Sequence, residues 1–540
     1  MSQTSAEPVD VVVVGSGPSG AVVSHTLATR GFKVVCLEQG DWINASDYPA
    51  NNPEWELLAQ KQWAHDPNVR KLPADYPVDV SDSDMWPVMY NAVGGGSTFY
   101  GAEWPRLVPS DFRVKSLDGV ADDWPIAYRD LAPYYDEVDR FIGASGLGGD
   151  PAYPDGLDYP MPPHPLGKAG LLAAEACNKL GWHWWPGANA IPTQKIRELA
   201  QCARWGVCEW GCPEGSKASF DIAYWPHAMK AGAKLVTGAR VRQVLTNAAG
   251  LATGVEWVDR AGVTHVQEAK TVVVCANGVG TPRLLLLSAS AAHPDGLANS
   301  SGLVGKNLML HPNCTSTGFY DMDLESTLGP AGQLLYSFEF YETNKSRDFV
   351  RGSKLHALPW PGLLNTIETQ RSLPYDQLWG KAVHDIAREA PGGLLWAANT
   401  EDLPLESNRV TLSSSLVDPD GIPAPKIEYR ISDNTRKILK FTVDRMRELH
   451  EVMGVVKTFD VELWIDQPGH LLGTARMGND PRSSVVDSFG RAHDCPNLFL
   501  ADGSIFVTSG SANPTATIAA LALRVGKHIA ETARNTEVPL

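Results

Sequence analysis

A β-branched run near the start of the chain leads directly into a glycine-rich turn. The run Val9 to Val14 has the length and composition of a buried strand, and Gly15-Ser16-Gly17-Pro18-Ser19-Gly20 follows it. Ala21 to Arg30 then has helical character, and Lys33 to Leu37 is typical of a second buried strand that ends in Glu38. Strand, turn, helix and strand in this order predict a βαβ unit within a parallel sheet.

The glycines of this turn have separate physical roles. One permits the tight turn, one lets the backbone approach a pyrophosphate, and one lets helix and strand pack closely. The phosphates would lie at the helix N-terminus, and Glu38, about twenty residues further on, could accept hydrogen bonds from ribose hydroxyls. We therefore predict a dinucleotide site. The unit alone does not distinguish FAD from NAD.

Length and composition limit the classes of protein that the chain can belong to. A chain of 540 residues exceeds the size at which one core keeps growing, so we expect two domains or one domain with large insertions. Hydrophobic residues make up 43% and charged residues 20%, which is ordinary globular composition, and no apolar stretch is long enough for a membrane span. The net charge of -16 argues against a nucleic-acid partner.

The N-terminus and the cysteines favour a cytoplasmic protein. The segment Met1 to Asp10 is polar and has neither a basic region nor a cleavage site of the kind found in signal peptides. Eight cysteines are few for this length, and they form no framework of paired spacings, so we expect most of them to be reduced thiols.

Further strands and helices are predicted along the rest of the chain. The glycine cluster Ala92 to Thr98 could bring backbone amides against a flat or anionic ligand. A helix is expected over 283–290, with Thr281 as its N-cap and Pro282 at its first position. The other expected strands are 234–236, 241–245, 254–258, 271–275, 409–413 and 426–429, and 497–503 is expected to form a strand and a turn. The other expected helices are 434–453 and 515–534.

Taken together, these segments resemble the glucose-methanol-choline (GMC) oxidoreductase superfamily from Val9 to about Arg534. Besides the first turn, the segments that carry the resemblance are 93–98, 276–288, 470–478 and 511–518. The resemblance implies FAD and an α/β chain, α+β overall, with a Rossmann-type FAD-binding domain and a substrate-binding domain built on an antiparallel sheet. We assign 1–110, 200–305 and 465–540 to the first domain, and 111–199 and 306–464 to the second.

Three further features are Gly95-Gly96-Ser97-Thr98, the segment Cys208 to Pro213 and an aromatic content suited to sugars. With these features the chain looks most similar, within the superfamily, to pyranose 2-oxidase and the bacterial glycoside 3-oxidases. This similarity implies oxidation of a secondary hydroxyl, at C3 or C2, of a sugar or glycoside, with O2 or another acceptor reoxidising the flavin. Fungal pyranose oxidases carry a flavin-linking histidine directly after the Ser-Thr pair, whereas this chain has Phe99 there. A phenyl ring cannot form that bond, so we expect the FAD to be bound non-covalently.

The resemblance also implies roles for individual residues. His470 occupies the position of the base, because a neutral imidazole can accept the hydroxyl proton, and Asn513 would hydrogen-bond the same substrate oxygen. Pro514 and Thr515 begin the last helix, whose positive end would face the flavin. The residues expected to contact FAD are Gly15, Ser16, Gly17, Pro18, Ser19, Gly20, Glu38, Gly95, Gly96, Ser97, Thr98, Val241, Ala276, Asp502, Gly503, Pro514 and Thr515.

Several alternatives stay open at this point. Cys202, Cys208 and Cys212 form C-x5-C-x3-C, and a related branch, the multi-subunit FAD glucose dehydrogenases, uses similarly placed cysteines for an iron–sulfur cluster. Three thiolates do not complete a four-ligand site, so we predict no metal. The substrate could instead be a sterol, choline or another non-sugar alcohol. An NAD(P)-linked flavin reductase is disfavoured because no second GxGxxG follows a strand, and a non-catalytic flavin protein because His470 and Asn513 are present.

Overall fold

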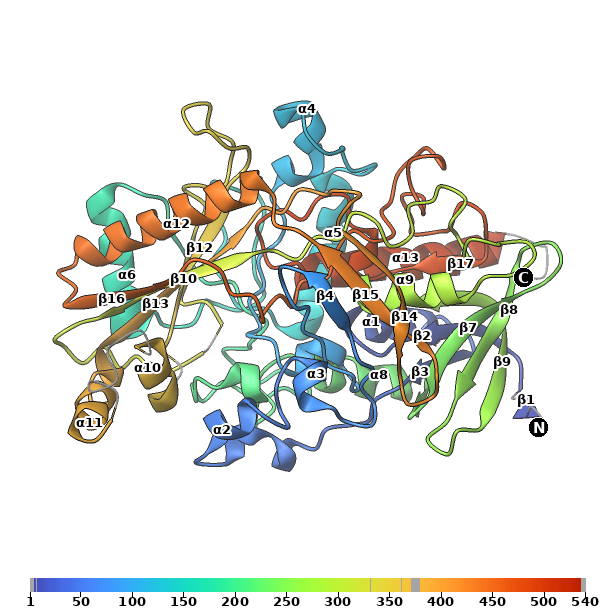
Figure 1. Ribbon diagram of the computed structural model, residues 1–540, viewed down its shortest axis with the longest axis horizontal. Helices are drawn as coiled ribbons and strands as arrows, with labels where there is room; N and C mark the ends of the chain where they lie inside the picture. Colours follow the sequence, from blue (N-terminus) through green and yellow to red (C-terminus); the bar gives the residue numbers. More distant parts are fainter. Residues whose placement is uncertain (1–3, 6, 331, 361, 371–378, 536–540) are drawn as a thin grey trace.

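The structure is a computed structural model that describes residues 4–5, 7–330, 332–360, 362–370 and 379–535. The predicted βαβ unit lies at the centre of its largest sheet (Figure 1). Strand β2 (Val9–Val14) is followed by helix α1 (Pro18–Ala28) and strand β3 (Val34–Glu38), and β2 and β3 are parallel. The predicted unit is therefore confirmed. We expect no signal peptide at the N-terminus. Residues 1–3 and 6 of that segment lie outside the described residues.

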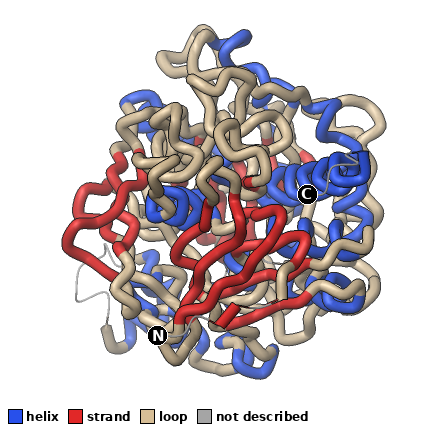
Figure 2. The backbone as a smooth tube through the Cα atoms, turned by 90° about the vertical axis from the view of Figure 1, so that its right-hand side faces the viewer, coloured by secondary structure: helices blue, strands red, loops and turns tan. Residues whose placement is uncertain are grey.

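Strand β9 (Thr264–Val274) joins two kinds of sheet. Its second half pairs in parallel with β2 on one side and β17 on the other, whereas its first half pairs antiparallel with β8. The order of the sheet is β6-β3-β2-β9-β8-β7, and Figure 2 shows it from the side on which the N-terminus lies. The other strands are β1 (Thr4–Ser5), β6 (Lys234–Thr237), β7 (Arg240–Thr246), β8 (Ala252–Val258) and β17 (Leu498–Leu500).

Helix α13 (Thr515–Asn535) packs along α1 against this parallel sheet, and α5 (Tyr128–Ile142) packs on α13 (Figure 1). The interface between α1 and α13 is built from small side chains, and Thr26 lies so close to Gly526 that an added Cβ would be 3.0 Å from its Cγ2. Because these helices approach closely, the beginning of α13 is held next to the glycine turn of β2 and α1.

Helix α9 begins earlier than predicted. We expected a helix over 283–290 with Thr281 as its cap, but α9 spans Asn277–Leu287 and contains Pro282 in its interior. Proline has no N–H, so it leaves the carbonyl four residues earlier, that of Gly278, without its helical partner. A hydroxyl from another segment, Thr474 Oγ1, donates to that carbonyl at 2.8 Å. This contact makes the early helix start possible, and it could not be seen in the local sequence.

A second, antiparallel sheet has the order β16-β10-β13-β12-β11-β5. Helices α12 (Asp433–Glu451) and α6 (Gly167–Leu180) cover one of its faces, on which Leu355, Ala357 and Trp396 are buried (Figure 1). The opposite face is free to line a cavity. The strands are β5 (Trp185–Pro186), β10 (Asn313–Phe319), β11 (Leu335–Ser337), β12 (Ser353–Leu358), β13 (Gly393–Thr400) and β16 (Lys457–Val461).

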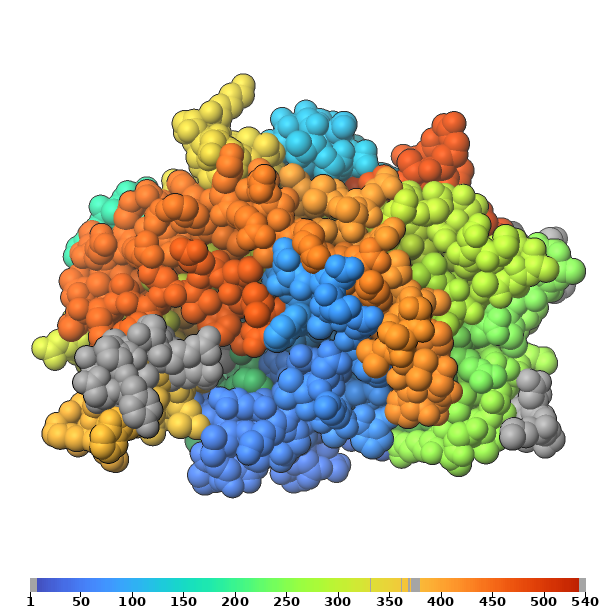
Figure 3. All heavy atoms as spheres, viewed as in Figure 1, coloured from blue at the N-terminus to red at the C-terminus, as the bar shows by residue number. Residues whose placement is uncertain are grey.

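A small third sheet connects segments that are far apart in the sequence. Strand β15 (Pro423–Tyr429) pairs antiparallel with β14 (Arg409–Val417) and parallel with β4 (Asp79–Ser83). In Figure 3 these segments, orange and blue, lie side by side on the surface. This sheet and the packing of α5 on α13 cross the boundary between our two assigned domains, and the exact division stays a prediction.

The remaining helices are short and lie in the connections. They are α2 (Trp55–Ala59), α3 (Pro67–Arg70), α4 (Val114–Asp118), α7 (Phe220–Ala223), α8 (Trp225–Lys230), α10 (Leu363–Thr369) and α11 (Lys381–Ala387). None of the helices in the described part of the chain combines the length and the apolar composition that a membrane span requires.

Candidate active site

One cavity of about 570 Å³ extends from the glycine turn to the C-terminal His/Asn residues. Its volume is within the range of cofactor and ligand sites. Gly20 and Thr98 are the two predicted residues that do not line it. The predicted residues that do line it are Gly15, Ser16, Gly17, Pro18, Ser19, Glu38, Gly95, Gly96, Ser97, Val241, Ala276, His470, Asp502, Gly503, Asn513, Pro514 and Thr515.

The three glycines of the first turn have different surroundings. Gly15 has a φ of 95°, which favours glycine, and an added Cβ would lie 2.5 Å from the carbonyl oxygen of Cys275. A Cβ on Gly20 would lie 1.9 Å from the carbonyl oxygen of Gly15, so this glycine allows helix and strand to touch. A Cβ on Gly17 would be 3.9 Å from its nearest neighbour and would fill space in the cavity.

The second glycine cluster forms a 3-10 turn, Gly95–Thr98, facing the first. Ser97 Oγ donates to the carbonyl of Gly94 at 2.6 Å. The carbonyl of Thr98 points away from the cavity lining and accepts a hydrogen bond from the buried Lys217 Nζ at 2.7 Å. Thr98 therefore anchors the turn from behind, while Gly95, Gly96 and Ser97 reach the cavity.

Two buried carboxylates lie near the ends of parallel strands. Glu38 accepts hydrogen bonds from Ser16 N at 2.9 Å and Ser16 Oγ at 2.7 Å. Asp502 accepts from Thr281 Oγ1 at 2.6 Å and Asn277 N at 3.0 Å. Burial raises the pKa of both carboxyls, and the hydrogen bonds that they accept oppose this rise. Each carboxylate thus fixes the loop that lines its own part of the cavity.

His470 forms a pair with a histidine that we did not predict. His470 and His311 face each other through their Nδ1 atoms at 2.9 Å. On its other side, His311 Nε2 is 2.6 Å from the carbonyl oxygen of Gly510 and 3.2 Å from that of Ser509. Burial lowers the pKa of His311 to about 4. The pKa of His470 is held well below its usual value, first by burial and then by His311 and Lys354.

The hydrogen bonds of this pair define the tautomer of each ring. A carbonyl oxygen only accepts, so His311 Nε2 carries the proton, and its Nδ1 is the acceptor in the neutral ring. His470 Nδ1 must then donate to His311 Nδ1. The lone pair of neutral His470 therefore lies on Nε2, the nitrogen that takes no part in the pair. His470 has the protonation state that a general base requires.

Asn513 lies directly before Pro514 and helix α13, and it lines the same cavity as His470. Its Oδ1 accepts a hydrogen bond from Lys354 Nζ at 2.6 Å. Lys354 also donates to Glu103 Oε2 at 2.5 Å. Hydrogen bonds thus connect His470 to His311, and Asn513 through Lys354 to Glu103.

One wall of the cavity is formed by the second sheet, through the face that α12 and α6 do not cover. Residues alternate along each strand, and Lys354 on β12 lies opposite Asn399 on β13, which lies opposite Asn313 on β10. The row beyond contains His356, Ala397 and Thr315. Moving outward along the strands, the cavity wall becomes less polar. The residues of these three strands that line the cavity are Asn313, Thr315, Thr317, His356, Leu358, Leu395, Ala397 and Asn399.

Sequence reasoning did not find His311, Lys354, Glu103 or the polar sheet face. Part of the signal was present in Ser353–Leu358, where Lys354 and His356 alternate with apolar residues. Such alternation predicts a strand with one polar face. It does not indicate which residue that face meets.

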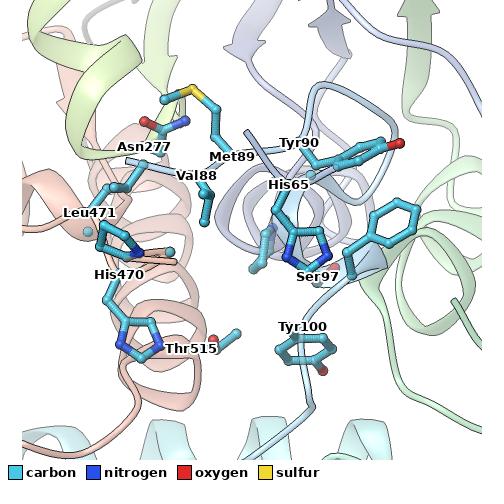
Figure 4. Close-up of a pocket in the computed structure, with 18 of the residues that line it drawn as sticks. His65, Val88, Met89, Tyr90, Ser97, Tyr100, Asn277, His470, Leu471 and Thr515 are labelled. Atoms are coloured by element: carbon cyan, nitrogen blue, oxygen red, sulfur yellow. The ribbon is translucent and has the colours of Figure 1, made fainter. Parts of the chain in front are cut away.

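Aromatic side chains close the far side of the cavity. In Figure 4, His470 and Thr515 lie on one side and His65, Tyr90 and Tyr100 on the other. The ring of Phe99, where fungal pyranose oxidases have histidine, packs against Tyr90 with 4.1 Å between ring centroids.

The three clustered cysteines are not among the residues that line the cavity. Cys212 Sγ is 3.1 Å from Ser216 Oγ, and Cys202 Sγ accepts a hydrogen bond from Arg204 N. None of the eight cysteines forms a disulfide. Within the described residues no three His, Cys, Asp or Glu side chains are grouped as metal ligands.

Comparisons with known proteins identify the class. Sequence profiles described as GMC oxidoreductase match residues 9–313 and 404–522. The chain therefore belongs to the GMC oxidoreductase family, whose enzymes oxidise CH–OH groups of alcohols and sugars.

Several relatives match almost the whole chain. It is 43% identical to the 2-methyl-1,2-propanediol dehydrogenase of Mycolicibacterium austroafricanum, over 97% of this chain and 96% of the relative. It is 31% identical to the fructose dehydrogenase large subunit of Gluconobacter japonicus, over 96% and 97%. A crystal structure of pyridoxine 4-oxidase from Mesorbium loti covers 96% of this chain and 99% of its own, with a TM-score of 0.67 and 18% identity, and confirms the fold.

The cavity fits the FAD that the family implies. The N-terminus of α1 has no acidic residue in its first turn, so its free amides can meet phosphate oxygens. Gly17 leaves open space at that point. Glu38 lies at the end of β3, where ribose hydroxyls would meet it. The glycine turn, Glu38 and the turn at 95–98 would hold the cofactor.

Proposed function

We propose that the protein oxidises a secondary hydroxyl, at C3 or C2, of a sugar or glycoside and gives the keto sugar. Two observations support a polyhydroxylated substrate. The sheet face that lines the cavity carries Asn313, Asn399 and Thr315, which can hydrogen-bond to hydroxyls. One relative is a fructose dehydrogenase subunit, and another, 30% identical, is the paromamine 6'-oxidase of Streptomyces fradiae.

A second candidate is a small non-sugar diol. The 43% identity to a 2-methyl-1,2-propanediol dehydrogenase supports it, because that identity exceeds the identity to the sugar-acting relatives named above. Both candidates carry neighbouring hydroxyls and differ in size and in the position oxidised.

The observation that carries the proposed reaction is the contact of His470 with His311 through Nδ1, which leaves the lone pair of the neutral ring on Nε2. This nitrogen would take the proton of the substrate hydroxyl as the carbon–hydrogen bond breaks. Asn513 would hydrogen-bond the same oxygen, and negative charge that develops there would be stabilised by a donor already in place. Bound FAD supplies the acceptor for the hydride. The buried surroundings of His470 lower its pKa and so keep the imidazole neutral, with its Nε2 lone pair unprotonated.

The proposal also covers how FAD is bound, which acceptor reoxidises the flavin, and where in the cell the protein acts. Phe99 offers no nucleophile, so FAD is bound non-covalently, and protein denatured in acid should release it into the supernatant. Flavin that stays with the precipitated chain would contradict this. O2 or another acceptor reoxidises the flavin. A cytoplasmic location is supported by eight cysteines that form no disulfide.

The test is anaerobic mixing of the purified holoenzyme with a substrate panel, followed by product identification. Glucose, xylose and an aryl glycoside represent the first candidate, and 2-methyl-1,2-propanediol and 1,2-propanediol the second. We expect flavin absorbance to bleach fastest with a sugar or glycoside and the product to be a keto sugar. Faster bleaching with a small diol would favour the second candidate. No bleaching with any alcohol would overturn the proposed function.

A further inference from the structure

We propose that the buried Lys354–Glu103 ion pair positions the side-chain amide of Asn513, so that its Nδ2 group, and not its oxygen, meets the substrate hydroxyl. The proposal rests on the proposed function, because it specifies how Asn513 acts there. It makes Lys354 and Glu103 positioning residues that need not touch the substrate.

The three side chains come from separate segments. Lys354 lies on β12, Glu103 follows the turn at 95–98, and Asn513 precedes α13. Lys354 Nζ donates to Glu103 Oε2 at 2.5 Å and to Asn513 Oδ1 at 2.6 Å. The side chain of Lys354 is 0% exposed and that of Glu103 is 11% exposed. The contacts are therefore shielded from water, which would otherwise compete for them.

The chemistry of an ammonium group defines the orientation of the amide. A lysine ammonium has donors and no acceptor, so only Oδ1 of Asn513 can face it favourably. The reversed amide would place an NH2 group against the cation. With Oδ1 held by Lys354, Nδ2 is the group left for a ligand in the cavity that Asn513 and His470 line. Negative charge on the substrate oxygen would be stabilised by Nδ2–H and repelled by Oδ1.

Glu103 makes the buried cation tolerable. Burial lowers the pKa of Lys354, and Glu103 opposes that effect. The pKa of Glu103 is lowered despite its burial, because His356 and Lys354 favour the carboxylate. Removing either partner would leave an uncompensated charge in the interior. The pair thus allows a strong donor to be placed behind Asn513.

The test compares Lys354→Met, Asn513→Ala and the variant with both changes, each as FAD-bound enzyme. Methionine keeps the length of the side chain without a donor. We expect Lys354→Met to slow anaerobic flavin reduction by about 10- to 100-fold. This loss of rate should not exceed the loss that follows removal of a hydrogen-bond donor to a developing oxyanion. In the Asn513→Ala background the same change should cost less than about threefold, because linked residues are non-additive. Lys381→Met is the matched control, since Lys381 is 86% exposed.

A second readout avoids turnover. A tertiary alcohol has a hydroxyl but no hydrogen on its carbinol carbon, so it can bind and cannot be oxidised. Its dissociation constant, measured from the change in flavin absorbance, should rise by a similar factor in Lys354→Met and Asn513→Ala. An unchanged constant in Lys354→Met together with a raised one in Asn513→Ala would overturn the proposal.

In Lys354→Met the carboxylate of Glu103 has lost its cation, and this unpaired charge could by itself slow the enzyme. The double variant Lys354→Met/Glu103→Gln removes both charges and is the control for that effect. It also replaces Lys354→Met in the test if that variant does not fold. We expect the double variant to stay slow, because nothing orients the amide. A return to the wild-type rate would overturn the positioning role. A wild-type rate in Asn513→Ala would instead contradict the proposed function itself, so the two failures are distinguishable.

Discussion

The two ends of the cavity are built in different ways. At the end formed by the first glycine turn, Gly15, Gly17, Gly20 and Glu38 come from one contiguous βαβ unit. At the other end, His470 meets His311, and Asn513 meets Lys354, each across 159 residues of chain. The first end is a local motif, and the second is an assembly made by the fold. Changes at the first end should therefore affect folding and cofactor affinity, and changes at the second should affect the reaction.

The largest effect on folding stability should come from Gly20→Ala. A Cβ there would lie 1.9 Å from a backbone oxygen of Gly15, and neither backbone can move without separating α1 from β2. We expect a loss of about 3 kcal/mol or more in the free energy of unfolding, at the upper end of overpacking costs. Chemical denaturation of the FAD-free protein measures it. Stability equal to wild type would show that helix and strand do not depend on this contact.

Gly17→Ala offers a matched change in the same turn. Its Cβ would be 3.9 Å from the nearest heavy atom, and a φ of -64° suits alanine, so the protein should fold as well as wild type. The methyl group would occupy space needed for backbone approach to the pyrophosphate, and we expect FAD to bind about tenfold more weakly. Fluorescence titration of the FAD-free protein gives the affinity. Wild-type affinity would contradict the placement of the phosphates here.

The substitution His311→Phe tests the end of the cavity at which His470 and Asn513 lie. Phenylalanine keeps a buried ring but cannot accept the proton of His470 Nδ1, so the tautomer is no longer fixed. We expect flavin reduction to slow by about tenfold, a part of the full contribution of a general base. His311 also lowers the pKa of His470, so in the variant the acid side of the rate profile should move to higher pH.

The control for this change is His450→Phe. His450 is buried and has a pKa lowered to about 4, but it lies on α12 behind the second sheet. Its replacement should leave the pH profile in place. Equal shifts in both variants would mean that the His311 contact has no specific role.

The same contrast explains what could be predicted from the sequence. The βαβ unit and most strands of the first sheet were predicted because their signals are local, whereas no strand of the second sheet was predicted. The start of α9 was missed because Thr474, far along the chain, satisfies the carbonyl freed by Pro282. His311 and Lys354 were missed because a single histidine or lysine in the sequence carries no sign of the residue that the fold places against it. His470 and Asn513 were predicted only through the family resemblance.

The most direct test of the account is anaerobic flavin reduction in His470→Ala, measured by stopped flow with the wild-type enzyme alongside. We predict that the variant retains FAD, because its glycine turn is unchanged, and reduces it about 10²- to 10⁴-fold more slowly. FAD-bound His470→Ala that is reduced at the wild-type rate would contradict the assignment of the base.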